Sequence, residues 1–153
     1  MNYPKWFKYV SCIIVYNSEG KILLGKRREG ELEGHKWAIL GGLGAFGESD
    51  NRWDFAKREL EYDIRIECNL EKLKPFTMIV LCVPEGSLLI EDYFYYREDE
   101  RVEATKNEKA PIEAKWFSAK EIQELATAGQ IAFDNYKVLS EFNKQILHNL
   151  RIG

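Results

Sequence analysis

Residues 41–66 read GGLGAFGESDNRWDFAKRELEYDIRI, and this stretch decides the expected fold. It starts with a cluster of four glycines, which let the backbone turn tightly and approach a ligand closely. After Ser49 the apolar spacing changes to intervals of three and four, which marks one face of an amphipathic helix: Trp53, Ala56, Leu60 and Ile64. The stretch predicts a glycine-rich loop leading into a helix, with Ser49 or Asp50 as its N-cap.

The same stretch carries a group of acids. Glu59 and Asp63 are four residues apart and share one face of the predicted helix, while Glu48 lies in the loop before it. Arg58 is next to Glu59 in sequence and can bind Glu48 by a charge-assisted hydrogen bond. Carboxylates that converge near exposed backbone carbonyls form a hard-oxygen site, which suits Mg²⁺ or Mn²⁺ and does not suit Zn²⁺.

The flanking sequence mixes strand and helix patterns without a regular βα repeat. Runs of β-branched and aromatic residues predict strands at residues 8–16, 21–26, 37–40, 75–83, 88–97 and 113–117. A capping box, Ser118-x-x-Glu121, predicts a helix to about Ala128, and Gly129 separates it from a last helix at residues 133–150. This order predicts an α+β fold or a mixed-sheet sandwich.

Length and composition limit the class of protein. The 153 residues suit one domain, residues 1–153, and the 45% hydrophobic and 31% charged residues exclude a disordered chain. The formal net charge of −3 gives no basic field for a nucleic-acid duplex, although a small anion remains a candidate ligand.

Three cysteines and the N-terminus bear on the compartment. Cys12, Cys68 and Cys82 lie far apart, without C-x-x-C spacing, among apolar neighbours, and we expect all three to be reduced core residues. No apolar run reaches the roughly 20 residues of a membrane helix. The first residues lack a secretory apolar segment, so a cytoplasmic protein without a membrane partner is expected.

The glycine-rich loop and acidic helix resemble the signature of the Nudix hydrolases: G, five residues, E, seven residues, then R-E-U-x-E-E-x-G-U, where U is aliphatic. Gly42 and Glu48 have the first spacing, and the match resumes at Arg58-Glu59-Leu60. Trp37 to Gly42 is similar to the usual W-x-x-P-G-G approach. The resemblance covers residues 8–127 in order, with segments similar to the family's second strand and to its last strand and helix.

The chain also departs from that signature. Nine residues separate Glu48 from Arg58, where the signature has seven, and residues 50–54 are expected to hold the extra two. The other departures are substitutions for the usual proline, the two glutamates of the acidic pair and the closing glycine: Leu40, Tyr62, Asp63 and Arg65.

The resemblance implies a Nudix-like α/β/α sandwich with a central mixed β-sheet. It implies an Mg²⁺- or Mn²⁺-dependent hydrolase that cleaves a nucleoside diphosphate linked to another group, by attack of water on phosphorus. The metal would be bound by Glu59, Asp63 and the Gly42 carbonyl, with Glu59, Glu48 and Arg58 as the catalytic group. The altered acidic pair favours a nucleotide sugar as substrate by analogy with a Nudix subgroup.

Further roles are expected around this site. Lys26 or Arg27, and also Arg28, would offset the charge of the substrate phosphates. A further acid from the charged loop and its end is a candidate for metal binding or catalysis: Glu103, Glu108 or Glu113.

Two alternatives to a hydrolase stay open. One is a Nudix-like domain that binds a nucleotide or nucleotide sugar without hydrolysing it. The other, weaker one is an isomerase of a diphosphate ester. The oligomeric state is also open, with a homodimer as one option.

Overall fold

The computed structural model describes residues 7–44 and 51–152, and in these ranges seven strands form one mixed sheet. The strands are β1 (Phe7–Tyr16), β2 (Ile22–Lys26), β3 (Trp37–Ala38), β4 (Leu40–Leu43), β5 (Lys74–Cys82), β6 (Leu88–Arg97) and β7 (Ala114–Phe117). Their order is β3-β2-β1-β6-β5, with β4 also paired to β1 and β7 to β2. The pairing of β1 with β6 is parallel and the other pairings are antiparallel.

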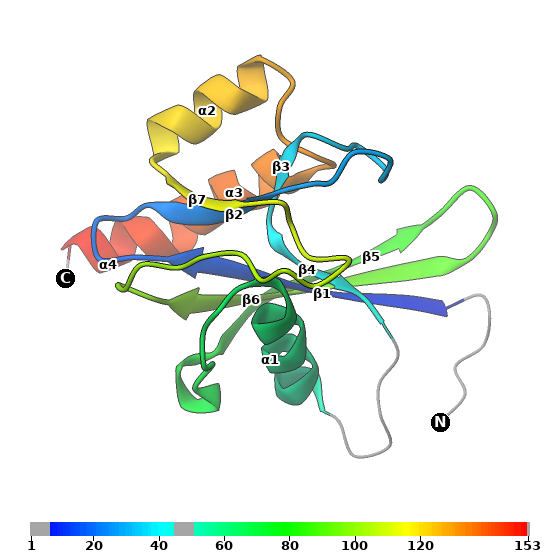
Figure 1. Ribbon diagram of the computed structural model, residues 1–153, viewed down its shortest axis with the longest axis horizontal. Helices are drawn as coiled ribbons and strands as arrows, with labels where there is room; N and C mark the ends of the chain where they lie inside the picture. The colour runs from blue at the N-terminus through cyan, green and yellow to red at the C-terminus, as the bar shows by residue number, and fades with distance from the viewer. Residues whose placement is uncertain (1–6, 45–50, 153) are drawn as a thin grey trace.

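Helices cover both faces of this sheet (Figure 1). They are α1 (Arg52–Asp63), α2 (Ala119–Thr127), α3 (Asn135–Phe142), a π-helical turn (Asn143–Leu147) and α4 (His148–Ile152), with a 3₁₀ turn at Leu70–Lys72. α1 lies on one face, and α2, α3 and α4 lie on the other. The predicted α/β/α sandwich around a mixed sheet is confirmed. None of the helices in the described ranges is long and apolar enough to cross a lipid bilayer.

The alternation of side chains along β1 produces two cores, one on each face. Ile13 and Val15 face α1 and pack in a cluster with Leu60, whereas Cys12 and Ile14 belong to the opposite cluster with residues of α3. All of these side chains are buried. The sheet therefore fixes the position of α1 through apolar packing along most of its inner face.

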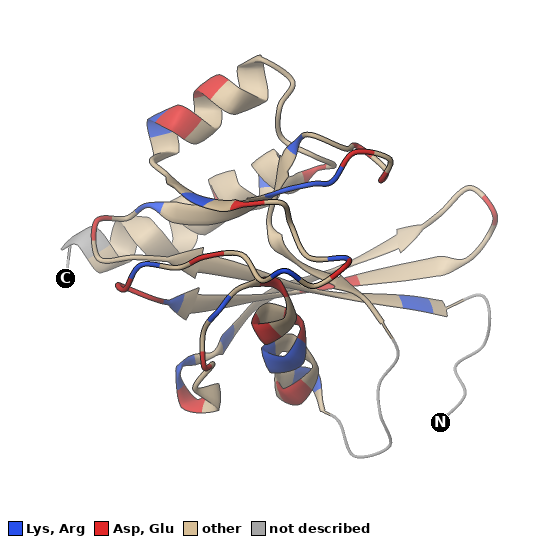
Figure 2. Ribbon diagram, in the orientation of Figure 1, with Lys and Arg blue, Asp and Glu red and all other residues tan. Residues whose placement is uncertain are grey.

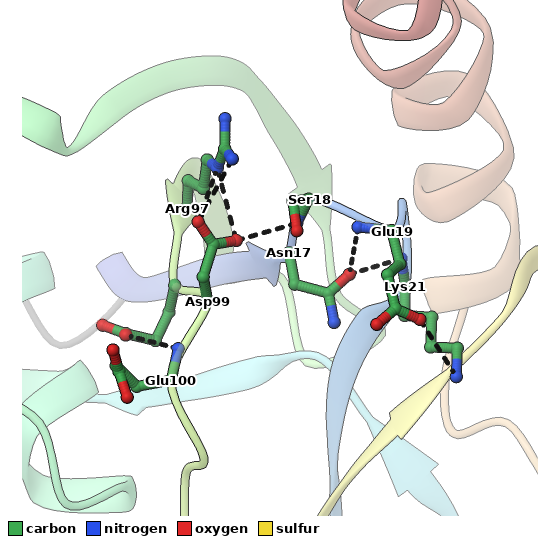
Figure 3. Close-up of polar contacts among 8 residues, drawn as sticks. Asn17, Ser18, Glu19, Lys21, Arg97, Asp99 and Glu100 are labelled. Carbon is green, nitrogen blue, oxygen red and sulfur yellow. Dashed lines mark hydrogen bonds and ion pairs between the residues drawn. The ribbon is translucent and has the colours of Figure 1, made fainter.

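An ion pair fixes the first turn of α1 to the sheet. The Arg52 guanidinium donates to both carboxylate oxygens of Asp92 on β6, each at 2.7 Å, and the Tyr9 hydroxyl donates to the same carboxylate. Asp92 is fully buried, so these hydrogen bonds replace the contacts with water that its carboxylate loses on folding. Just after β6 ends, Asp99 accepts a hydrogen bond from the Ser18 backbone at 2.8 Å and pairs with Arg97 (Figure 3).

Helix boundaries differ from the sequence expectation in two places. The N-cap of α1 is Asn51, whose side chain accepts from the Asp54 amide at 3.0 Å; Ser49 and Asp50 lie outside the described residues. The helix expected from residue 133 begins at Asn135, because Phe133 has a φ of 54°, in the left-handed region.

Two strand-level expectations are also corrected. The single strand expected at residues 37–40 is divided into β3, which pairs with β2, and β4, which pairs with β1. Cys12 and Cys68 are buried as expected, but Cys82 is exposed, because it is the last residue of β5, where the β5–β6 hairpin extends beyond the helices. The capping box at Ser118 and Glu121 is confirmed, and Gly129 follows α2 with a φ of 70°.

Candidate functional site

The turn at Gly41 and Gly42 lies against β1 so closely that Gly41 tolerates no side chain. Gly41 has a φ of 140°, and a Cβ atom there would lie 2.0 Å from the Ser11 carbonyl oxygen. Such a φ favours glycine, and the contact is far below any van der Waals distance. The absence of a side chain at Gly41 thus allows β4 to pair closely with β1, next to α1.

Glu59 occupies the space that a side chain at Gly42 would fill. A Cβ atom built on Gly42 would lie 2.6 Å from Glu59 Oε2. Burial raises the pKa of Glu59 above its usual value, and the neighbouring Arg58 guanidinium opposes that rise. α1 therefore holds a partly desolvated carboxylate directly against the backbone of the glycine turn.

Asp63 lies one helical turn further along and contacts the same turn. Its Oδ2 accepts a hydrogen bond from the Gly41 amide at 2.9 Å, and only 4% of the residue is exposed. Burial raises the pKa of Asp63 from 3.8 to about 7, the Gly41 hydrogen bond lowers it, and the charge of Glu59 raises it. Glu59 and Asp63 thus share the face of α1 that the sequence spacing predicts, and both are directed at Gly41 and Gly42.

Arg58 stacks on a ring of its own helix. Its guanidinium carbon lies 5.1 Å from the centroid of the Phe55 ring, a cation–π distance. Phe55 in turn would contact a Cβ atom at Gly44 at 3.0 Å, so this ring fills the space beside the glycine loop. The predicted partner Glu48 lies outside the described residues, and the Arg58–Glu48 pair stays a prediction.

Tyr62, which replaces the first acid of the usual pair, contacts the loop between β6 and β7. Its carbonyl accepts hydrogen bonds from the side chains of Thr105 and Asn107, and its hydroxyl accepts from the Lys109 amide at 3.2 Å. The Asp63 carbonyl also accepts from the Thr105 amide at 2.9 Å. Tyr62 therefore attaches this loop to the end of α1.

α1 ends without a left-handed glycine. Its C-cap, Ile64, has extended backbone angles, and the Arg65 amide donates to the Glu103 carbonyl at 2.8 Å. Ile64 also forms an isolated antiparallel bridge with Ala104. Backbone contacts with the loop thus replace the cap that a closing glycine provides.

A cleft with a volume of about 450 Å³ opens beside Gly41 and Gly42. Clefts of this size accommodate small-molecule ligands. Its walls come from β1, β4, β5, β6 and the segment before α3, and the lining includes Val10, Leu43, Leu89, Phe133 and the acids Glu91 and Asp134. Burial raises the pKa of Glu91, which accepts a hydrogen bond from the Tyr93 hydroxyl.

The three basic residues expected to contact phosphate lie in different surroundings. Arg27 lines both this cleft and a smaller one of about 40 Å³ that it shares with Gly41 and Asp63. Lys26 lines neither and its ammonium lies 5.8 Å from the Trp37 ring centroid. Arg28 donates to the carbonyls of Ala110 and Asn107, so it supports the loop.

The loop acids Glu103, Glu108 and Glu113 are not among the residues that line the two clefts. Glu103 is exposed and pairs with Arg101, while the carbonyl of Glu113 accepts from the Lys26 amide. The expected role of the three loop acids in catalysis stays a prediction.

Few side chains in the described part of the chain are placed to bind a metal ion. Across residues 7–44 and 51–152 no group of three or more His, Cys, Asp or Glu side chains could hold a metal ion. Glu59 and Asp63 are two such side chains, and Glu48, the third predicted acid, lies outside these ranges. Two carboxylates with backbone oxygens fit Mg²⁺, which commonly uses one or two protein carboxylates together with water and substrate phosphates.

Comparison with known proteins agrees with this geometry. A sequence profile of the NUDIX domain matches residues 6–142. The chain belongs to the NUDIX domain family. A search of curated protein sequences finds no match.

Solved Nudix structures share the fold at low sequence identity. A MutT protein from Methanosarcina mazei Go1 superposes with a TM-score of 0.64 and 17% identity over 94% of this chain and 100% of that one. A C. elegans Ap4A hydrolase gives a TM-score of 0.60 and 14% identity over 91% and 98%.

A bifunctional NMN adenylyltransferase/ADP ribose pyrophosphatase from Francisella tularensis, complexed with AMP and Mn, gives a TM-score of 0.68 and 18% identity over 90% of this chain. This chain spans 41% of the length of that enzyme.

Several residues around the site have no signal in the Nudix signature. Phe133, Asp134 and Glu91 line the cleft, and the Asn135 side chain accepts from the Ile39 amide at 2.9 Å. They come from β6, from the segment before α3 and from the first residue of α3, far from the glycine loop in sequence. Their approach to this loop depends on pairing and packing between distant segments, which no local pattern reveals.

Proposed function

We propose that the protein hydrolyses a nucleoside diphosphate linked to another group, by metal-assisted attack of water on phosphorus. The observation that carries this proposal is the placement of Glu59 against Gly42, with Asp63 hydrogen-bonded to Gly41, beside a cleft of about 450 Å³. Asp63 lines the smaller cleft of about 40 Å³, which shares Arg27 and Gly41 with the larger one, so the glycine turn separates the two carboxylates of α1 from the ligand-sized space. Membership of the NUDIX domain family supports the same reaction class.

The residues present fit a divalent cation. The missing side chain at Gly42 lets the Glu59 carboxylate lie directly against the backbone of the glycine turn. When bound, Mg²⁺ or Mn²⁺ would neutralise phosphate charge and lower the pKa of water. We assign metal binding to Glu59 and the Gly42 carbonyl, with Asp63 as a ligand that also holds the Gly41 amide and so orients the turn.

The wider cleft suits the remainder of the substrate. Arg27 lines it together with Gly41, and its guanidinium, which donates to the Leu32 carbonyl and lies over the Phe133 ring, can also offset phosphate charge there. Lys26 and Arg28 do not line this cleft. The apolar and acidic walls suit a nucleoside with its hydrogen-bond donors. We propose a nucleotide sugar or an ADP-ribose-like dinucleotide as substrate, in keeping with the ADP ribose pyrophosphatase among the similar structures.

A second candidate function is nucleotide binding without hydrolysis. It is favoured by Tyr62, whose hydroxyl contacts the Lys109 amide and which supplies no carboxylate. It is also favoured by Asp63, because a pKa of about 7 leaves this group partly protonated at neutral pH. Both features reduce the negative charge available to a metal.

Hydrolysis of a substrate panel separates the two candidates. Nucleotide sugars, ADP-ribose, diadenosine tetraphosphate and nucleoside triphosphates are incubated with Mg²⁺ or Mn²⁺, and products are separated by chromatography. We expect slow hydrolysis that rises with metal concentration. Glu59→Gln should lower it by at least about 10²-fold, while Glu124→Gln on exposed α2 should not change it. If the wild-type protein binds nucleotide but hydrolyses none of the panel, the hydrolase proposal is wrong and nucleotide binding without hydrolysis is the function.

A further inference from the structure

β5 is an edge strand whose side chains stay exposed along most of its length. It ends the sheet order and pairs only with β6 among the described strands. Met78, Val80 and Leu81 are 44%, 59% and 39% exposed. In Figure 1 the β5–β6 hairpin extends beyond the helices, and Figure 2 shows this projecting part of β5 without charged residues. One edge of its backbone is therefore open to another strand.

The sequence of β5 protects this edge only at its start. Lys74 and Pro75 begin the strand, and a register shift follows between Pro75 and Thr77. From Thr77 to Cys82 the sequence is TMIVLC, without charge, proline or glycine. Natural edge strands are usually blunted by such residues, and a long apolar edge without them pairs readily with another chain.

The two ends of β5 carry opposite charges, which suits pairing with a second copy. Lys74 is exposed at the start, and Glu85, an exposed acid that also pairs with Lys8, lies in the turn after the end. Antiparallel pairing about a two-fold axis brings the start of one strand against the end of the other. Residues that oppose each other must point to the same side of the sheet, so an axis at Ile79 pairs Met78 with Val80 and places Lys74 next to Glu85.

We propose that the protein forms a two-fold symmetric homodimer in which the β5 strands of two copies pair antiparallel and join the two sheets. The apolar segment from Thr77 to Cys82 forms the centre of the interface. Leu81 lines the cleft beside Gly41, and Val80, its neighbour in sequence, points to the other side of the sheet. The interface thus borders the cleft without occupying it, and this proposal does not depend on the proposed reaction.

Val80→Lys tests the dimer because it places like charges together near the axis. The molar mass of the wild type and of the variant is measured by light scattering after size-exclusion chromatography over a range of concentrations. We expect a wild-type dimer and a Val80→Lys dissociation constant raised by at least about 10²-fold, since like charges brought together at an interface oppose association. Leu32→Lys, at an exposed apolar residue outside β5, should leave the dimer intact.

Hydrogen exchange on the same samples locates the interface. The amides of residues 77–82 that face away from β6 should be protected in the wild type and exchange faster in Val80→Lys, while amides of β1 keep their protection and so report an intact fold. A wild-type monomer, a dimer that persists in Val80→Lys with unchanged exchange, or an open-ended polymer would overturn the proposal.

Discussion

Replacing Asp63 by asparagine should make the stability of the metal-free protein less dependent on pH. Burial raises the pKa of Asp63 from 3.8 to about 7, so between these values the folded protein holds a proton that the unfolded chain has lost. Because the folded state binds more protons, the free energy of unfolding falls as pH rises through this window. The amide that Asp63→Asn introduces stays neutral, and its oxygen can still accept from the Gly41 amide.

The size of the effect follows from the shift. A rise of about three pKa units corresponds to roughly 4 kcal/mol, at 1.36 kcal/mol for each unit. The wild type should carry this penalty in full above pH 7 and lose it as pH falls towards 4. Asp63→Asn should therefore gain stability relative to the wild type by several kcal/mol on going from pH 4 to pH 8.

Urea unfolding at a series of pH values, in the presence of a chelator, measures this difference. Other carboxyl groups also have shifted pKa values; burial raises the pKa of Glu59 and of Glu91, for example. They are present in both proteins, so the difference between the two curves isolates Asp63. Two curves that run parallel from pH 4 to pH 8 would refute the raised pKa of this carboxyl group.

Three further substitutions test other contacts. Gly42→Ala would put a Cβ atom 2.6 Å from Glu59 Oε2; we expect turnover in the substrate panel to fall while the melting temperature changes little, and unchanged turnover would contradict the placement of this carboxylate. Arg52→Ala leaves Asp92 buried without its guanidinium partner and should lower the free energy of unfolding in urea by about 3–5 kcal/mol. A double variant with Arg52→Met and Asp92→Leu should lose less, and equal losses would argue against the ion pair. Tyr62→Phe removes the acceptor for a loop amide and should lower that free energy by about 1 kcal/mol, with faster exchange of this amide; unchanged exchange would show that the hydroxyl does not hold the loop.

The sequence predicted the elements whose signals are local. The boundaries of β6 agree with the expected strand at residues 88–97, because the strand starts after the turn residues 84–87 and its aromatic run at residues 93–96 is followed by charged residues. The capping box at Ser118 likewise depends on residues three apart. The shared face of Glu59 and Asp63 follows from helical spacing alone.

Features that depend on pairing between distant segments could not be predicted in this way. The division of residues 37–40 into β3 and β4 depends on which neighbour each part pairs with, β2 or β1. The exposure of Cys82 depends on its place at the end of β5, where the hairpin extends beyond the helices, while its apolar neighbours suggest a core residue. Asp92 is one of two adjacent acids within a strand, and its partner Arg52 is forty residues away in the sequence.

The attachments at the two ends of α1 have a consequence for how this sequence can vary. Arg52 joins the first turn to β6, and Tyr62 and Arg65 join the end of the helix to the loop before β7, each through a partner outside the signature stretch. The helix then does not depend on the length of the preceding loop or on a closing glycine for its position. The length of the loop and the residue at the closing-glycine position are then under less structural constraint. Insertions in the loop and substitutions of that glycine can accumulate while Glu59 keeps its place against Gly42. Divergence of the signature and preservation of its geometry are compatible in this chain for that physical reason.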